Sequence, residues 1–318
     1  MKSRNYLRIG LVLALILSVM VGCHGGLANV QGRETTSPET DENQGDEKET
    51  ESMKEVKKET LKVMTYNVLL NPEKEGRPVN FGEEMAATVR EQDPDVFGTQ
   101  ENTQLIHEVS FAGLTEYVCF RGEELSSNPA YRGNYVYWKK EKFMAVETGH
   151  QFMSETPDVK SKFEGSKEYR GFTYVFLESR ATGNRFLFIA LHADYRAEES
   201  VRVKQLRVLT SFLQSEKWAD IPAVVVGDFN STAKQNSIIT FLAENPGIVM
   251  TSKAAKTKGD TNGTLIVGGF TTRQDYIFDY IFVTKNRIET EYYSVILNEK
   301  EGKYPSDHLP VVAHLTLR

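Results

Sequence analysis

The chain is poor in cysteine: its 318 residues include only Cys23 and Cys119. If Cys23 is lipidated, as argued below, no intramolecular disulfide can form, so a disulfide-stabilised secreted fold is excluded. Cys119 lies in the apolar stretch Tyr-Val-Cys-Phe. Thiols in such surroundings are usually buried and inert, so we predict that Cys119 is not a nucleophile.

An excess of positive charge is also missing. The formal net charge is -6 for the whole chain, and residues 61–318 hold 30 basic and 34 acidic residues, a net charge of -4. Long-range attraction of nucleic acid requires a basic field. The composition therefore excludes a general pull toward nucleic acid, although it leaves a local basic patch open.

Only one long apolar run occurs, at residues 9–21, and basic residues precede it. Thirteen residues are few for a membrane-spanning helix but suit the core of a secretory signal. Gly22-Cys23 follows and resembles a bacterial lipoprotein cleavage box, with Met20 where a branched aliphatic residue is usual. We expect a signal peptide at 1–22, lipidation of Cys23 and export from the cytoplasm, either as a cell-envelope lipoprotein or as a secreted protein. Ordinary cleavage near Gly22, or a short uncleaved anchor, also suits this run.

Aromatic residues are absent from 24–60, which is rich in Glu, Thr, Lys and Gly. Such a segment buries too little apolar surface to offset the entropy of ordering. We expect residues 23–60 to form a disordered acidic linker that spans roughly 35 Å and holds the following domain off a membrane.

From residue 61 onward, short apolar runs alternate with turn residues and amphipathic stretches. Many strands with few helices predict packed sheets covered by helices. We expect helices at 82–92 and 198–215. Strands are expected at 61–67, 95–100, 116–120, 134–138, 172–178, 185–191, 222–227, 275–283 and 309–317.

Several of these strands end in a carboxylate, an amide or an imidazole. A strand entered from its start places that start beside the ends of antiparallel neighbours, so these groups can meet at one sheet edge. The residues are Asn67, Glu101, His192, Asp228 and Asn230 at strand ends, and Ser306, Asp307 and His308 just before the last strand.

Asp279 differs because it sits inside an apolar strand, on the face shared by Ile277 and Ile281. A carboxylate on such a face is costly unless it is paired. An imidazole N–H or an imidazolium is a natural partner, so we expect a histidine beside Asp279.

Each of these residues also has an ordinary structural explanation. Asn67 could start a turn, Glu101 could begin a helix over 101–110 because Glu favours a first turn, and a lone histidine is usually a satisfied, partly buried side chain. Together, however, they share one placement and one set of oxygen-rich donors. Such donors suit Mg²⁺, with Mn²⁺ or Ca²⁺ as alternatives, rather than a structural zinc.

Six short stretches of the chain contain these residues. Their sequences and their order along the chain resemble the motifs of the endonuclease/exonuclease/phosphatase superfamily, which has the deoxyribonuclease-I-like fold. The resemblance implies an α/β domain at 61–318, a four-layer αββα sandwich of two mixed β-sheets flanked by helices. The stretches are 64–68 (MTYNV), 94–101 (PDVFGTQE), 191–193 (LHA), 227–230 (GDFN), 279–283 (DYIFV) and 306–310 (SDHLP).

The resemblance also implies roles. Glu101 would be the main metal ligand, with Asn67 beside it and Asp307 completing the site. Asp228 and Asn230 would position the attacking water and the phosphate. His308, oriented by Asp279, would contact phosphate or act as a base, and His192 would donate a hydrogen bond or a proton near the scissile phosphate. Arg170 and Tyr195 lie nearby in sequence and are further candidates for phosphate contact.

The expected function is hydrolysis of phosphate esters by a monomer, foremost as a phosphodiesterase or nuclease at the cell surface. The alternative is a phosphatase or phospholipase acting on sugar phosphates, inositol phosphates or phospholipid head groups. The net negative charge of the domain slightly favours this alternative. A third reading is a surface binding module without turnover. Residues 231–274 contain no tryptophan, which gives no support to the membrane-inserting aromatic hairpin of bacterial sphingomyelinases.

Overall fold

A computed structural model of the chain describes residues 58–122 and 133–318. The predicted signal peptide, Cys23 and nearly all of the predicted linker lie outside these residues. Strand β1 begins at Glu59, which pairs with Leu317. Residues 59 and 60, predicted to belong to the linker, are therefore part of the domain. A search of the described residues finds no helix with the length and apolar character needed to cross a membrane.

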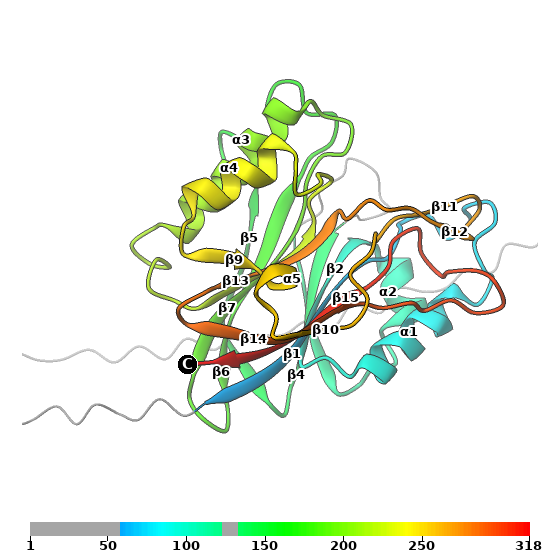
Figure 1. The fold of residues 1–318 in the computed structure, drawn as a ribbon, viewed down its shortest axis with the longest axis horizontal. Coiled ribbons are helices and arrows are strands. Elements are labelled where there is room, and N and C mark those ends of the chain that lie inside the picture. The colour runs from blue at the N-terminus through cyan, green and yellow to red at the C-terminus, as the bar shows by residue number, and fades with distance from the viewer. Residues whose placement is uncertain (1–57, 123–132) are drawn as a thin grey trace, which may run out of the picture. The chain divides into compact units, whose positions relative to one another are not determined.

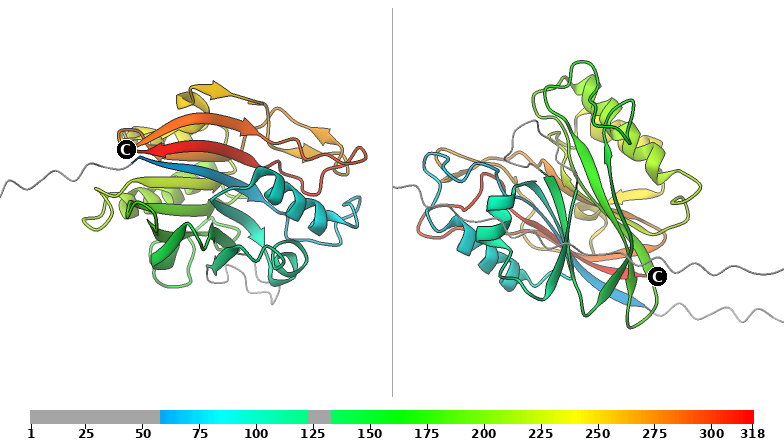
Figure 2. Two further views of the ribbon diagram at one scale, coloured as in Figure 1. Left: turned by 90° about the horizontal axis from the view of Figure 1, so that it is seen from below. Right: turned by 180° about the vertical axis from the view of Figure 1, so that it is seen from behind.

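Two mixed sheets form the body of the domain (Figures 1 and 2). The first has the strand order β10-β14-β15-β1-β2-β4-β3, with β1 and β2 parallel. Its strands are β1 Glu59–Asn67, β2 Val96–Asn102, β3 Tyr117–Arg121, β4 Gly133–Lys139, β10 Thr257–Lys258, β14 Ile288–Val295 and β15 Val311–Leu317.

The second sheet has the order β5-β6-β7-β8-β13-β9, with β7 and β8 parallel. A separate hairpin joins β11 Ile266–Val267 to β12 Thr272–Arg273. The strands of the second sheet are β5 Phe143–Phe152, β6 Gly171–Ser179, β7 Arg185–His192, β8 Ala223–Asp228, β9 Ile248–Met250 and β13 Asp279–Thr284.

The two sheets pack face to face, because one buried apolar cluster draws side chains from both. Val63 and Val96 come from the first sheet, and Val175, Phe188 and Val224 come from the second. Apolar residues alternate along these strands, so each strand contributes one face to this cluster and the other face to an outer layer.

Helices cover both outer faces. Helices α1 Phe81–Gln92 and α2 Gln104–Ser110 pack on the first sheet, while α3 Glu199–Leu213 and α4 Asn236–Glu244 pack on the second. A short helix, α5 Thr251–Ala254, contacts β13 and β14 and so lies between the edges of the two sheets (Figure 1). This arrangement confirms the four-layer αββα sandwich.

Gly98 allows the two sheets to approach each other beneath the strand ends, and Gly227 allows β7 and β8 to lie close together within the second sheet. A Cβ atom on Gly98 of β2 would lie 2.8 Å from the Cβ of Ala190 and 2.9 Å from a methyl of Val226, both in the other sheet. Gly227 has a φ of 147° and leaves no room for a Cβ beside the carbonyl of Leu191. Glycine is therefore required at both positions on steric grounds.

Some elements differ from expectation. The strand expected at 275–283 begins only at Asp279, because the preceding residues bond to Thr264, whose N–H donates to the carbonyl of Tyr276 and whose hydroxyl accepts from the N–H of Phe278. The last strand begins at Val311 because Pro310 has no N–H to pair. Strands β5 and β14 and helix α4 had no counterpart in the sequence prediction.

Candidate active site

Three of the predicted site residues form one row across the second sheet. His192 of β7 pairs in register with Asp228 of β8, and Asp228 pairs with Asp279 of β13. Residues directly opposite each other on neighbouring strands share a face. Asp279 therefore lies in the same row as Asp228 and His192, although it is inside an apolar strand.

The first sheet brings Asn67 and Glu101 to the same place. Asn67 ends β1, and Glu101 sits in an irregularity of β2, where the pairing with β4 shifts and the backbone takes a φ of 56°. A β-bulge turns a side chain away from the direction that the pleat would give it. The amide nitrogen of Asn67 lies 3.5 Å from Oε1 of Glu101.

Neither ordinary explanation accounts fully for these two residues. Helix α2 is capped by Thr103, whose side chain accepts a hydrogen bond from Ile106, so Glu101 does not begin it. Asn67 does form a local turn, since its Oδ1 accepts from the backbone of Leu69. Its side-chain nitrogen nevertheless reaches across to the other sheet.

Side chains from both sheets approach one oxygen atom, Oδ2 of Asp228. The side-chain nitrogen of Asn67 donates to it over 3.0 Å. Nε2 of His192 lies 3.4 Å from it, and Nε2 of His308 lies 3.7 Å from it. Asp228 is almost fully buried. Three nitrogen groups thus surround a single carboxylate oxygen.

Asp279 has a histidine partner, His308, as the sequence analysis predicted. Its Oδ2 lies 2.8 Å from Nδ1 of His308, and this leaves Nε2 facing Asp228. Burial lowers the pKa of His308, but the charges of Asp279 and Asp228 outweigh burial and hold it well above its ordinary value. Burial raises the pKa of Asp228 to about 7, against the opposing effect of His308.

Arg170 lies against the second histidine, with its NH1 group 2.8 Å from Nδ1 of His192. Burial lowers the pKa of this arginine. The contact follows from the sheet register, because Gly171 pairs with His192 and so places Arg170 beside it.

Asn230 completes the turn after β8. Its backbone N–H donates to Oδ1 of Asp228 over 2.8 Å, and its side chain donates to the carbonyl of Ala193 over 3.0 Å. A φ of 49° bends the chain here. Asn230 therefore ties the end of β8 to the end of β7.

Asn67, Glu101 and Asp307 fit a divalent cation. Burial raises the pKa of Asp307, and the nearby charge of Glu101 raises it further. The charge of Arg77 reaches both carboxylates, but its guanidinium donates its hydrogen bonds to the carbonyls of Val68, Leu69, Asn71 and Pro305. Two carboxylates and an amide supply the oxygen donors that Mg²⁺ prefers.

A second group of donor atoms, from Asp228, Asp279 and His308, also lies within 4.8 Å of one another. Asp279 and His308 are joined by a hydrogen bond between Oδ2 and Nδ1, while Oδ1 of Asp279 has no hydrogen-bond partner among the described residues.

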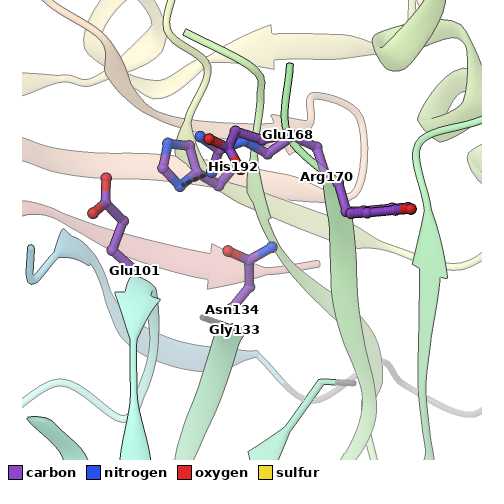
Figure 3. A pocket seen from close by; sticks show the side chains of 7 residues that line it. Glu101, Gly133, Asn134, Glu168, Arg170 and His192 are labelled. Atoms are coloured by element: carbon purple, nitrogen blue, oxygen red, sulfur yellow. Dashed lines mark hydrogen bonds between the residues drawn. The ribbon is translucent and has the colours of Figure 1, made fainter. Parts of the chain in front are cut away.

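A small pocket opens beside the row. In Figure 3, Glu101 and Asn134 stand at the strand ends of the first sheet, with His192 and Arg170 across from them. Asn134 donates to the carbonyl of Gly171 over 2.8 Å. The pocket is lined by Glu101, Asn134, Glu168, Tyr169, Arg170 and His192.

Sequence reasoning missed four residues that shape the site. Asn134 starts an expected strand, which is the signal that exposed the other strand-end residues. Asp194, two residues after His192, accepts from the backbones of Lys167 and Glu168 and so holds the segment that carries Arg170. Glu168 and Arg77 gave no signal. Tyr195, a predicted phosphate contact, is half exposed and lies against Arg196, so its role remains a prediction.

The sequence model of the endonuclease/exonuclease/phosphatase family matches residues 64–308. No curated protein matches the chain significantly. Among solved structures, an endonuclease/exonuclease/phosphatase family protein from Bacteroides thetaiotaomicron is 24% identical, with a TM-score of 0.73 over 82% of this chain and 99% of that one.

Two further structures show the breadth of this fold. A mannosyl-6-phosphatase from Bacteroides thetaiotaomicron is 24% identical, with a TM-score of 0.68 over 80% of this chain and 99% of its own. TDP2 from D. rerio, solved with a single-strand DNA product, is 16% identical, with a TM-score of 0.65 over 80% and 98%. At these identities the likeness establishes the fold alone.

Proposed function

Because the chain belongs to the endonuclease/exonuclease/phosphatase family, we propose that it is a divalent-metal-dependent hydrolase that cleaves phosphodiesters. The observation that carries the proposal is the convergence of Asn67, His192 and His308 on one oxygen of Asp228. Attack of water on an anionic phosphate requires a base that accepts the proton of the water and hydrogen-bond donors that hold the phosphoryl oxygens.

The geometry assigns a task to each group. Asp228 is the carboxylate placed to accept the proton of an attacking water. The Nε2 atoms of His192 and His308 face the same space, where they are positioned to bind phosphoryl oxygens. Asp279 fixes the ring of His308, and Asn230 fixes the carboxylate of Asp228. Donors that are held in place before reaction stabilise the charge that develops in the transition state.

Glu101, Asn67 and Asp307 would hold the cation on the other side of this space. When bound, Mg²⁺ would offset negative charge on the phosphoryl group and assist departure of the leaving oxygen. Arg77 supports these ligands, because its hydrogen bonds join the segment after Asn67 to Pro305, two residues before Asp307.

A substrate panel tests the proposal. The purified protein is assayed with Mg²⁺, Mn²⁺ or Ca²⁺ on an aryl phosphodiester, single-stranded and plasmid DNA, RNA, phospholipids and small phosphate monoesters. We expect the diesters to be turned over fastest. Metal-dependent binding of these ligands without any hydrolysis would instead identify a binding module.

A phosphomonoesterase is the second candidate, and the pocket beside Glu101 favours it. Asn134, Glu168 and Arg170 offer both acceptors and donors there, as a small polyhydroxylated leaving group would require. The mannosyl-6-phosphatase of the same fold acts on such a compound. Faster turnover of sugar phosphates than of every diester in the panel would select this candidate.

We also propose that the protein is exported and anchored through a lipid on Cys23. The support is the basic start, the 13-residue apolar run and the Gly22-Cys23 pair. Labelling of cells with an alkyne fatty acid tests this: the wild-type chain should carry the label, and Cys23→Ser should not. A label retained by Cys23→Ser would contradict the lipid anchor.

A further inference from the structure

A groove of about 490 Å³ lies beside the active site and contributes nothing to the chemistry described above. Lysines from three separate segments line it: Lys234 before α4, Lys253 in α5 and Lys258 in β10. We refer to it as the lysine groove. Its other polar lining includes Thr232, Tyr276 and Tyr280, and Asp275 is its single acidic residue.

The three lysines gather around one groove in a domain whose net charge is negative. Within residues 58–122 and 133–318, none of them forms an ion pair, and all three are exposed. Their neighbour Lys256, outside the groove, contrasts with them because it pairs with Glu289 and Glu291. Three ammonium groups around one groove, without carboxylate partners, form a site for an anion.

An aromatic side chain stands in the same groove. Tyr276 is 54% exposed, and its ring stacks on that of Phe278 with an interplanar angle of 2° and a centroid distance of 5.8 Å. A tyrosine held flat by a second ring presents a free face on which a planar group can stack. Lysines combined with an exposed aromatic platform are typical of sites for single-stranded nucleic acid.

The groove is continuous with the active site through two chain segments. Thr232 follows Asn230 by two residues, a reach of about 7 Å at most. In the other segment, Ile277 precedes Asp279 by two residues. The hydroxyl of Tyr280 lies 3.0 Å from the carbonyl oxygen of Ser231 and 2.8 Å from that of Ile277, within hydrogen-bonding distance of both walls.

We propose that the lysine groove binds the nucleotide next to the scissile phosphate in a single-stranded oligonucleotide, with its phosphate on the lysines and its base on Tyr276. The proposal rests on the proposed phosphodiesterase activity and names its substrate class. A groove that contacts only a phosphate group and the flat face of a base binds the strand whatever its sequence.

Salt dependence of oligonucleotide binding tests the lysines. Each phosphate contact with a single strand contributes about 0.7 to the slope of log K against log salt concentration. Because the groove holds one phosphate, we expect Lys253→Gln/Lys258→Gln to reduce that slope by up to about 0.7. Binding of an oligothymidylate in Ca²⁺ at several salt concentrations measures it, and an unchanged slope would overturn the proposal.

A matched control removes the same charge elsewhere. Lys140 and Lys285 follow the ends of β4 and β13 that lie away from the site, and both are exposed. Lys140→Gln/Lys285→Gln should leave the slope unchanged. If the control and groove variants reduce the slope equally, the effect is one of net charge and the groove is not the site.

Tyr276→Ala tests the stacking platform. Loss of one base–aromatic contact should weaken binding of the oligothymidylate on the order of tenfold. Inorganic polyphosphate, which has no bases, should lose little affinity for this variant. Equal loss for both ligands would overturn the assignment of a base to Tyr276.

Failure of the groove and failure of the active site give different results. If the wild type cleaves the aryl phosphodiester with metal but the groove variants match it on oligonucleotides, only the groove proposal is wrong. If the aryl diester is not cleaved at all, the proposed function is wrong. The expected result is unchanged turnover of the aryl diester and weaker binding of oligonucleotides in the groove variants.

Discussion

The guanidinium of Arg170 lies 2.8 Å from Nδ1 of His192. A guanidinium can only donate, so Nδ1 must accept, and the ring proton of neutral His192 is on Nε2. That proton points toward the space beside Asp228 Oδ2, 3.4 Å away. The relationship makes His192 a hydrogen-bond donor of fixed orientation. Arg170 acts through His192 as a positioning residue.

Replacing Arg170 should reduce turnover more than binding. In Arg170→Met the imidazole loses the group that sets its tautomer and orientation, and a displacement of about 1 Å is enough to cost on the order of 10²-fold in kcat. Arg170→Lys keeps a cationic donor and should recover part of the loss. Steady-state kinetics on the aryl diester measure kcat, and ¹⁵N NMR of the His192 ring reports the tautomer.

The control for this change is Arg207→Met, which removes an exposed arginine paired with Glu244 on the outer helices. It should leave kcat within about twofold. An Arg170→Met variant with normal kcat, or one that retains the wild-type tautomer, would contradict the positioning role.

Arg77 should stabilise both the fold and the cation site. Its guanidinium donates to four carbonyls and stacks 3.7 Å above the ring of Phe81. Arg77→Met would leave buried carbonyls unpaired, so we expect a loss of about 2–4 kcal/mol in the free energy of unfolding. Urea denaturation without metal measures this loss.

Calorimetric titration with Mn²⁺ should also show weaker binding by Arg77→Met, because the segments that carry Asn67 and Asp307 lose their connection. The exposed Arg90 of α1 is the control, and Arg90→Met should change stability by less than about 0.5 kcal/mol. Wild-type affinity for Mn²⁺ in folded Arg77→Met would refute the link to the cation site.

Gly98→Ala should destabilise the protein by forcing the two sheets apart at this position. The new methyl would meet Ala190 and Val226 at less than 3 Å, and overpacking of this kind costs about 1–3 kcal/mol. Gly113→Ala is the matched change, since nothing lies within 4 Å of a Cβ there. Adding Ala190→Gly to Gly98→Ala should restore part of the stability in urea denaturation. Equal stabilities of the two alanine variants would contradict this packing.

His150 should make the protein less stable in mild acid. Burial lowers its pKa to about 4, and no hydrogen-bond partner among the described residues reaches either ring nitrogen. Because the unfolded chain binds the proton more readily, stability should fall between pH 6.5 and 4, by up to about 3 kcal/mol from this group.

In His150→Leu this contribution is absent. Its free energy of unfolding, measured in urea from pH 7 to pH 4, should therefore fall less steeply than that of the wild type. Parallel pH profiles of the two proteins would show that His150 is protonated equally in the folded and unfolded states.

The chemistry of the site was more predictable than its assembly. A carboxylate on an apolar strand face needs a partner, so the sequence alone indicated a histidine beside Asp279, and the structure places His308 there. Strand-end residues such as Asn67 and Asp228 were found because period-two apolar runs stop at them. These signals are local, and a single sequence contains them.

Contacts that depend on register or on backbone acceptors were not predictable. Arg170 was suspected from its nearness in sequence, but its contact with His192 follows from the pairing of Gly171 with His192. Arg77 bonds to the carbonyl of Pro305, and a carbonyl has no sequence signature. Strand β5 was missed because it is an edge strand, with exposed Met144 and Val146 that obscure its alternation.

The most direct test of the account is hydrolysis of an aryl phosphodiester by the purified protein, before and after removal of divalent metal with EDTA, alongside Glu101→Ala. We predict that activity disappears in EDTA, returns with Mg²⁺, and falls by about 10³-fold or more in folded Glu101→Ala. Hydrolysis that is unaffected by EDTA, or retained in Glu101→Ala, would contradict a cation-dependent site at Glu101.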